Sequence, residues 1–164
     1  MHTMERKVVC RMDLQTEQAV WQRVKAPGGL TAEEAVLPER LEALILEQRA
    51  DAAGLQMLSG KLRGQGSAAL ARLARRCEAR AQRLTTLHYL LTGRRLRVQT
   101  PKLPTPGPLP EALRAAWLRT RQAAKSFDAL RAEFSDYAED FADDAMEAKT
   151  DGRTLERLLR QEMR

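Results

Sequence analysis

Four arginines in the middle of the chain have the spacing of a binding surface. Arg72, Arg76, Arg80 and Arg83 follow one another at intervals of four, four and three residues, so that they share one face of a helix. Guanidinium groups in such a row bind phosphate without reading sequence. No aromatic residues interleave to stack bases, and no groove-reading motif is present. The four arginines are therefore a candidate anion-binding face, which we expect on the outer side of its helix.

Cysteine and histidine, the usual residues of nucleophilic and metal chemistry, are scarce. Cys10 and Cys77 are far apart and match no metal or redox spacing, so we interpret them as free thiols of a reducing cytoplasm. The histidines are His2 and His88, and His88 falls on an apolar helical stripe, which is typical of a core histidine. No nucleophile set, Gly-rich phosphate loop or zinc spacing occurs. We therefore expect no catalytic residue.

The composition predicts an all-α protein of one domain. Hydrophobic residues make up 43% of the 164 residues and aromatic residues only 4%, while strong helix formers such as Ala, Leu, Arg and Glu dominate. No apolar stretch approaches the roughly 20 residues that cross a bilayer. The N-terminus has a basic start but no apolar segment of a secretory signal. We expect a cytoplasmic protein without a membrane partner.

Proline, glycine and capping residues divide the chain into an N-terminal arm over 1–37 and a bundle over 38–164. The arm carries a short helix over 16–24, and the pattern at Thr31 and Glu34 indicates a turn before the first long helix. Gly64–Gly66 is a predicted break, with Ser67 as the following helix cap, and Gly93 is a predicted left-handed cap. The long helices are predicted over 38–63, 67–92, 110–134 and from the break at 135–136 to near the C-terminus, with a weak point at 150–152.

The links between these helices predict the topology. The first and second helices, and the third and fourth, have short links and form antiparallel hairpins. The link over 94–109 contains Pro101, Pro104, Pro106 and Pro108 and should be extended. Its reach of up to about 50 Å exceeds the roughly 38 Å of a 25-residue helix. It can therefore run the length of the bundle and place the third helix parallel to the second, which is the connection of a ferritin-like four-helix bundle.

Two stretches of sequence resemble the ferritin-like proteins of the rubrerythrin type. Leu44–Glu47 followed by Asp51–Ala53 is similar to their first ligand helix, and Cys77–Ala81 followed by Leu87–Gly93 is similar to their second. The segment Val20–Val24 resembles the opening of an uncharacterised bacterial branch from anaerobic gut Firmicutes. The resemblance covers residues 40–93 best and residues 110–160 weakly.

The resemblance implies a di-iron site that this chain has lost. Such proteins use a Glu from two helices and a Glu-x-x-His from the other two. Glu47 and Glu78 match two ligand positions, but Ala81 stands where the second helix needs a histidine. The third helix offers Thr120 or Arg121, and the fourth offers residues 147–151 without a histidine. Glu47 and Glu78 are thus interpreted as vestigial positions, and no metal or other cofactor is expected.

Charge is distributed very unevenly along the chain, which has a net charge of +6. Eleven basic residues and one acid lie between Lys61 and Lys102, whereas seven acids and no base lie between Glu133 and Glu147. If the second and fourth helices are antiparallel neighbours, the arginine face should meet acids of the fourth helix, within one molecule or across a dimer. The acids expected to do so are Asp136, Glu139, Asp140, Asp143 and Asp144.

These observations favour a non-catalytic interaction or scaffolding protein that kept the bundle and lost its metals. The first alternative is an anion- or nucleic-acid-binding module that uses the arginine face. The second is a metal-binding oxidoreductase with a residual site around Glu47 and Glu78. A homodimer or another protein is preferred to nucleic acid as the partner.

Overall fold

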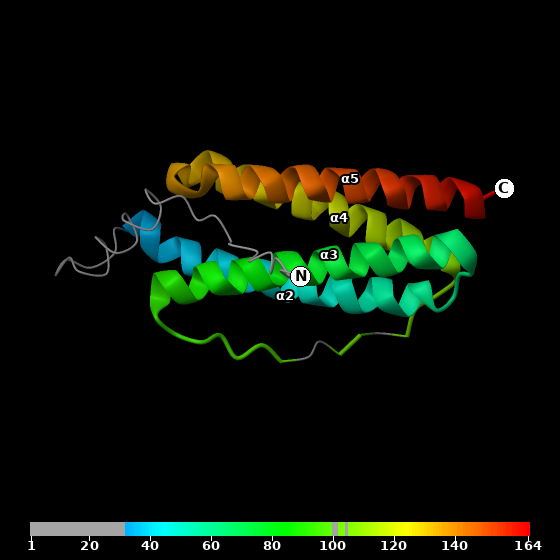
Figure 1. Cartoon of the computed structure of the whole chain (residues 1–164), viewed down its shortest axis with the longest axis horizontal. Helices are drawn as coiled ribbons and strands as arrows, with labels where there is room; N and C mark the ends of the chain where they lie inside the picture. The colour runs from blue at the N-terminus through cyan, green and yellow to red at the C-terminus, as the bar shows by residue number, and fades with distance from the viewer. Residues whose placement is uncertain (1–31, 100–101, 104) are drawn as a thin grey trace, which may run out of the picture.

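The computed structural model describes residues 32–99, 102–103 and 105–164, which form four long helices and one short 3₁₀ helix (Figure 1). The elements are α2 (Ala32–Ser59), α3 (Gly64–Thr92), α4 (Leu109–Glu133), η1 (Ser135–Tyr137) and α5 (Ala138–Glu162). No strand occurs in these described ranges, so the all-α expectation is confirmed for them. The predicted short helix over 16–24 and Cys10 lie outside the described residues.

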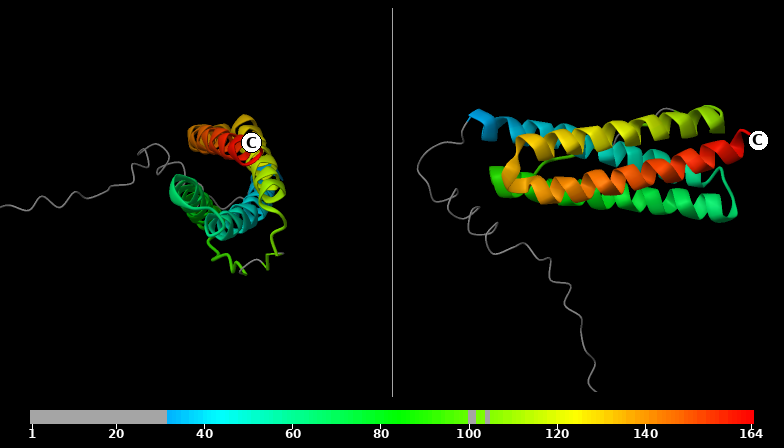
Figure 2. Two further views of the ribbon diagram at one scale, coloured as in Figure 1. Left: turned by 90° about the vertical axis from the view of Figure 1, so that its right-hand side faces the viewer. Right: turned by 90° about the horizontal axis from the view of Figure 1, so that it is seen from above.

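The helices are arranged as two antiparallel hairpins joined by a long crossover. α2 packs along α3, and α4 packs along α5. The link after α3 runs back along the length of the bundle, so that α4 starts at the same end as α3 and runs parallel to it (Figure 1). Seen end-on, α2 lies beside α4, and α3 and α5 form the remaining pair (Figure 2). The hairpin pairing and the crossover predicted from link lengths are confirmed.

The first long helix begins earlier than predicted. α2 starts at Ala32 and contains Pro38, which had been expected to open it. A proline inside a helix removes one backbone hydrogen bond near the N-terminal end. Leu37 and Leu41 on either side of it are buried, and their packing offsets that loss. The expectation of a separate turn before the first long helix was therefore wrong, because residues 32–37 belong to α2.

The turn between α2 and α3 also differs from the prediction. α2 ends at Ser59 and α3 begins at Gly64, so the expected break over Gly64–Gly66 is the first turn of a helix. Gly64 has a φ of 60°, a left-handed conformation that glycine adopts without strain. Ser67 does not cap α3: its Oγ donates to the carbonyl of Ser59 at 2.7 Å. The serine thus satisfies a free carbonyl at the end of α2.

The predictions for the other helix ends agree with the structure. Gly93 has a φ of 68° and donates its N–H to the carbonyl of Tyr89, which closes α3 as predicted. η1 occupies the predicted break before α5. α5 continues through the predicted weak point, and Gly152 is buried there against Thr120 of α4.

The interior consists of two apolar clusters with a polar layer between them. One cluster lies at the end where α3 finishes and includes Leu41, Leu84 and Phe127. The other lies at the α2–α3 turn and includes Leu55, Leu70 and Leu113. The buried polar residues whose positions fall between the clusters are Gln48 and Asp51 on α2, Arg80 on α3, Thr120 on α4 and Asp151 on α5. None of the described helices has the length and apolar content of a membrane span.

Candidate functional site

Each of the four helices supplies the polar layer from its core-facing stripe. On α2, Leu41, Leu44, Ile45, Gln48, Asp51, Ala52 and Leu55 follow one another at helical spacing, and all of them are buried. Arg80 and Asp151 occupy equivalent positions on α3 and α5. A polar residue on such a stripe must find its hydrogen bonds inside the bundle, because water is excluded there.

Arg80 is the centre of this layer. Its side chain is 1% exposed and donates from Nε to Oε1 of Gln48 at 2.8 Å. Its Nη1 donates to Oε2 of Glu147 at 2.7 Å and to Oδ2 of Asp151 at 2.9 Å, and Nη2 donates to Sγ of Cys77 at 3.2 Å. The expectation that Arg80 lies on the outer face of its helix was wrong. All three guanidinium nitrogens have acceptors, so the buried charge is compensated.

The surroundings of Arg80 keep it charged. Burial by itself lowers its pKa, but Cys77 and Asp151, together with the hydrogen bonds to Asp151 and Glu147, raise the pKa above its ordinary value. Burial raises the pKa of the Cys77 thiol to about 11, because the neighbouring guanidinium only partly offsets desolvation. The layer is therefore built around a permanent positive charge, with a thiol that stays protonated at neutral pH.

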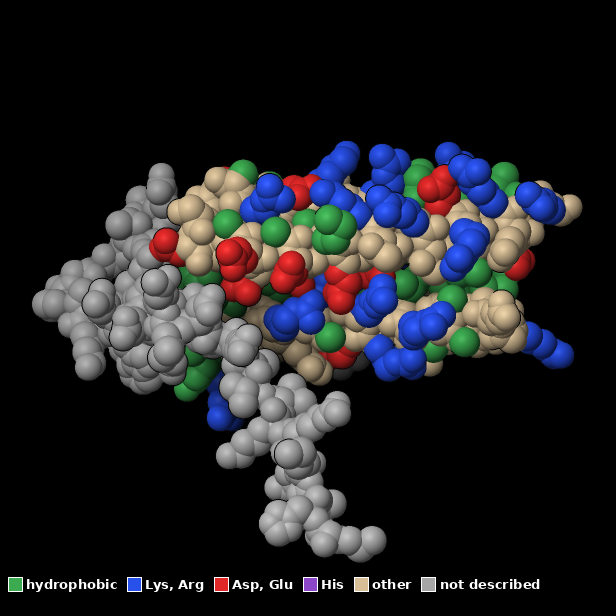
Figure 3. All heavy atoms as spheres, turned by 45° about the horizontal axis from the view of Figure 1, so that its top comes forward, with side chains coloured by type: hydrophobic (Ala, Val, Ile, Leu, Met, Phe, Trp, Pro, Cys, Tyr) green, Lys and Arg blue, Asp and Glu red, His purple; other side chains and the backbone are tan. Residues whose placement is uncertain are grey.

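Further arginine–carboxylate pairs join α3 to α5 on either side of Arg80. Arg76 pairs with Asp151 at 2.7 Å, and Arg83 pairs with Asp144 and, at 3.3 Å, with Glu147. Figure 3 shows acidic and basic side chains facing each other along this seam. The matching of the arginine face to acids of the fourth helix is thus present within one molecule.

The arginines of α3 pair with acids further along α5 than predicted. Of the predicted acids, Asp144 forms an ion pair with an arginine of α3, whereas Glu147 and Asp151, which were not among them, accept the other bonds. Asp151 was not among the expected acids because it falls in the predicted weak point at 150–152. Three of the four candidate anion-binding arginines are engaged in these pairs, and Arg72 remains exposed.

A separate ion pair lies on the α2–α4 side of the layer. Oδ1 of Asp51 accepts from Nε of Arg119 at 2.7 Å, and Asp51 is buried. Burial nevertheless raises the pKa of Asp51, since Arg119 and Arg80 lower it by less than desolvation raises it. Thr120, which was predicted together with Arg121 as a candidate for the ligand position of the third helix, donates its hydroxyl to the carbonyl of Ala116 at 2.9 Å.

Glu47 and Glu78 do not contribute to the group around Arg80. Glu47 is exposed at the edge of α2, where burial and then Asp51 raise its pKa. Glu78 is half-buried and lines a groove on the other side of α3. Across the described ranges, no three His, Cys, Asp or Glu side chains are grouped so that they could hold a metal ion. The carboxylates of the layer accept hydrogen bonds from the guanidinium of Arg80. The cation that these oxygen ligands bind is therefore an arginine of the chain and not a metal ion.

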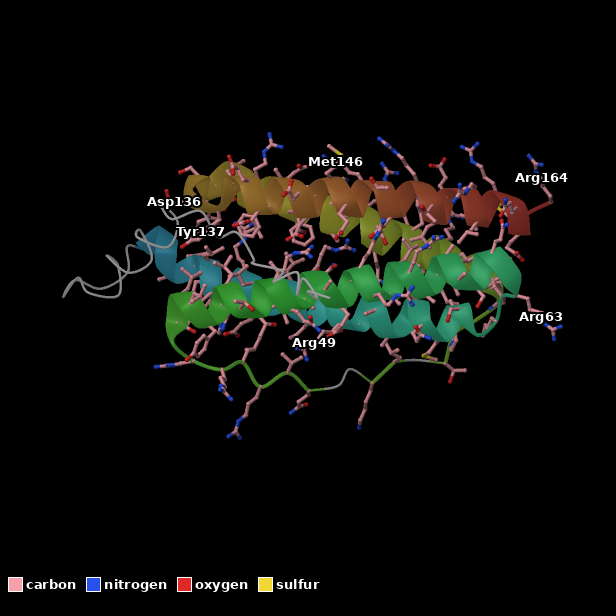
Figure 4. All side chains as sticks on the ribbon, in the orientation of Figure 1. Arg49, Arg63, Asp136, Tyr137, Met146 and Arg164 are labelled. Carbon is pink, nitrogen blue, oxygen red and sulfur yellow. The ribbon has the colours of Figure 1, made fainter. Side chains whose placement is uncertain are left out.

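The groove beside Glu78 has a volume of about 350 Å³ and lies between α2, α3 and the crossover. Its apolar lining consists of alanines, and its polar lining comes from Arg49, Gln56, Arg75, Glu78 and Gln99. Arg49 points to this side of α2 (Figure 4), and its buried Nε has no hydrogen-bond partner among the described atoms. The groove is open to solvent, and it shares no lining residue with the Arg80 layer.

His88 is buried in the core at 3% exposure, as its position on the apolar stripe predicted. Its Nε2 lies 2.9 Å from Oε1 of Glu42, and its Nδ1 has no partner in the part of the chain that the structure describes. Gln48 and Asp51 were not predicted as site residues. The signal that could have found them is their position, since both fall on the apolar stripe of α2.

No family model matches the chain, and the comparisons with curated proteins and with solved structures give no match either. Inferences about function therefore rest on the contacts and charges of the chain itself.

Proposed function

We propose that this chain is a non-catalytic bundle of ferritin-like layout that has lost its di-iron site and acts as an interaction or scaffolding protein. One observation carries the proposal. The buried guanidinium of Arg80 lies at mid-bundle and donates hydrogen bonds to Gln48, Glu147 and Asp151. A pair of metal ions in a bundle of this layout needs carboxylate and imidazole ligands from all four helices at that level.

Electrostatics support the same conclusion. A permanent positive charge with little exposure to water repels metal cations at short range, because the surrounding dielectric is low. The carboxylates near Arg80 already accept its hydrogen bonds, so they are not available as ligands without leaving the guanidinium unpaired. Leaving a buried charge unpaired costs several kcal/mol, on the order of 3–5. The arginine network is thus a structural replacement for a metal centre, and a role through surfaces fits it better than redox chemistry.

The alternatives draw less support from the contacts. Anion binding by the α3 face would use Arg72, Arg76, Arg80 and Arg83, and the last three of these already pair with acids of α5. A residual metal site would use Glu47 and Glu78, of which the first is exposed and the second lines a groove among two arginines.

Metal analysis of the purified full-length chain tests the proposal. Cells should be grown with added iron and manganese, and the protein should then be offered Fe(II), Mn(II) or Zn(II) anaerobically. We expect much less than one metal ion per chain by elemental analysis and no shift of the thermal midpoint with any of the three. About two metal ions per chain, together with a raised midpoint, would overturn the proposal.

A further inference from the structure

The side of α5 that faces away from the core changes sign along its length. Its residues recur at three- and four-residue spacing, opposite the buried stripe that includes Phe141, Ala148 and Leu155. The N-terminal half is acidic, the middle is uncharged and the C-terminal half is basic. In order, this outward stripe consists of Glu139, Asp143, Met146, Thr150, Arg153, Arg157 and Arg160 on α5, followed by Arg164 just after the helix, and all eight are exposed.

The charges of the outward stripe have few partners in the described part of the molecule. Among its arginines, only Arg160 has an ion pair there, with Glu156 on the same helix at 2.6 Å. Glu139 and Asp143 at the other end have no ion pair with any residue that the structure describes. Asp143 instead lies near another acid, Asp140. Burial raises the pKa of Asp140 most, and repulsion from Asp143 raises it further. Both halves of the stripe would therefore gain from a partner of opposite charge.

We propose that two copies of this chain pair through the outward stripes of α5, antiparallel about a two-fold axis at Thr150. This proposal rests on the proposed function as an interaction protein, and it identifies the partner as a second copy of the same chain. Asp143 and Arg157 lie seven residues before and after Thr150, about 10 Å along the helix in each direction. Glu139 and Arg160 also have their midpoint next to Thr150. One axis thus brings each acid opposite an arginine of the second copy.

The charge order selects this arrangement over a parallel one. In a parallel pair the arginines of one copy would meet those of the other, and like charges in an interface are strongly unfavourable. The two-fold axis repeats every contact, as in an isologous dimer. Met146 is 63% exposed and projects from the outer side of α5 near the axis (Figure 4), so pairing would cover an apolar side chain at the centre.

A second copy fits the stripe better than a nucleic acid does. A phosphate backbone would match the four arginines but would meet Glu139 and Asp143 further along the same stripe, where it would be repelled. Self-pairing matches both halves at once. Exposed ion pairs are individually weak and are screened by salt, so the dimer should be weak and most stable at low ionic strength.

Sedimentation of the full-length chain over a range of concentrations, at low and at high salt, tests the proposal. The native chain should dimerise at low salt and dissociate at high salt. Arg157→Glu alone and Asp143→Arg alone should each weaken dimerisation by roughly tenfold or more, because each places like charges together twice. Arg114→Glu, a charge reversal at an exposed position on α4, is the matched control and should leave dimerisation unchanged.

The decisive step is the rescue. An equimolar mixture of the Arg157→Glu and Asp143→Arg chains should form heterodimers, and a chain that carries both changes should again form homodimers. Circular dichroism checks that each variant is helical. A native chain that stays monomeric at low salt, or variants that do not rescue one another, would overturn the proposal.

Titration with a DNA duplex covers the other class of partner. A monomeric native chain whose affinity for DNA falls with Arg157→Glu would assign the stripe to nucleic acid and overturn the pairing. Metal content is measured separately from dimerisation. A metal-free monomer would contradict only the pairing of two copies. A metal-loaded dimer would contradict only the proposed function.

Discussion

Nη1 of Arg80 donates to Oδ2 of Asp151 at 2.9 Å, and the two side chains are 1% and 2% exposed. This contact joins α3 to α5 at the level where the two apolar clusters of the core are separated. The same carboxylate accepts from Arg76 at 2.7 Å. Asp151 therefore compensates one buried and one surface guanidinium, and the stability of the seam depends on it.

Replacing Arg80 by methionine should destabilise the protein by about 3–5 kcal/mol, because Asp151 and Gln48 would remain buried with lost partners. Urea unfolding followed by circular dichroism measures the change. Arg72→Met on the same helix is the control and should stay within about 0.5 kcal/mol, since Arg72 is exposed. Adding Asp151→Leu to Arg80→Met should recover part of the loss. If Arg80→Met and the control Arg72→Met changed the free energy of unfolding equally, the buried network would not stabilise the bundle.

Replacing Asp144 by asparagine should leave stability at pH 7 unchanged or slightly higher. Burial raises the pKa of Asp144 above 3.8 in the folded state, since the pairing with Arg83 only partly offsets desolvation. A carboxyl group whose pKa is higher in the folded than in the unfolded state binds more protons when folded. Its contribution to stability therefore falls as the pH rises through the range just above 3.8.

The pH dependence of that variant follows from the same linkage. Asparagine does not titrate, so the stability of Asp144→Asn relative to the native chain should increase between about pH 4 and pH 7. Urea unfolding of both chains at several pH values across this window measures the difference. A relative stability that decreases with pH would mean that the ion pair with Arg83 outweighs burial.

Gly152 should accept one methyl group but not a larger side chain. A Cβ atom there would lie 3.9 Å from Cγ2 of Thr120, an ordinary van der Waals contact. Gly152→Ala should therefore stabilise the protein by up to about 1 kcal/mol through helix propensity. Gly152→Leu should destabilise it by about 1–3 kcal/mol, because α4 blocks the additional atoms. Thermal unfolding separates the two; a destabilising alanine would show that α4 and α5 need a closer approach than this spacing.

The sequence by itself determined the elements and their connection. Strong helix formers and apolar stripes specify four long helices, and Gly93 and the break at Ser135 mark helix ends because their conformations are local properties of the chain. Link lengths then fix the hairpins and the crossover, since a chain segment has a definite reach. The failures at Pro38 and at Gly64–Gly66 have a local cause too: a signal for a turn was given more weight than the packing of the neighbouring apolar residues.

Only the tertiary structure decided the site. The arginine row on α3 and the acids of α5 are visible in the sequence, but which acid meets which arginine depends on the axial register of two hairpins that are far apart along the chain. That register buries Arg80, pairs Arg83 with Asp144 and gives Asp151 two partners. It is set by the packing of the apolar clusters on either side of the layer. Charge pairing adapts to it, because long guanidinium side chains reach acceptors over a full helical turn.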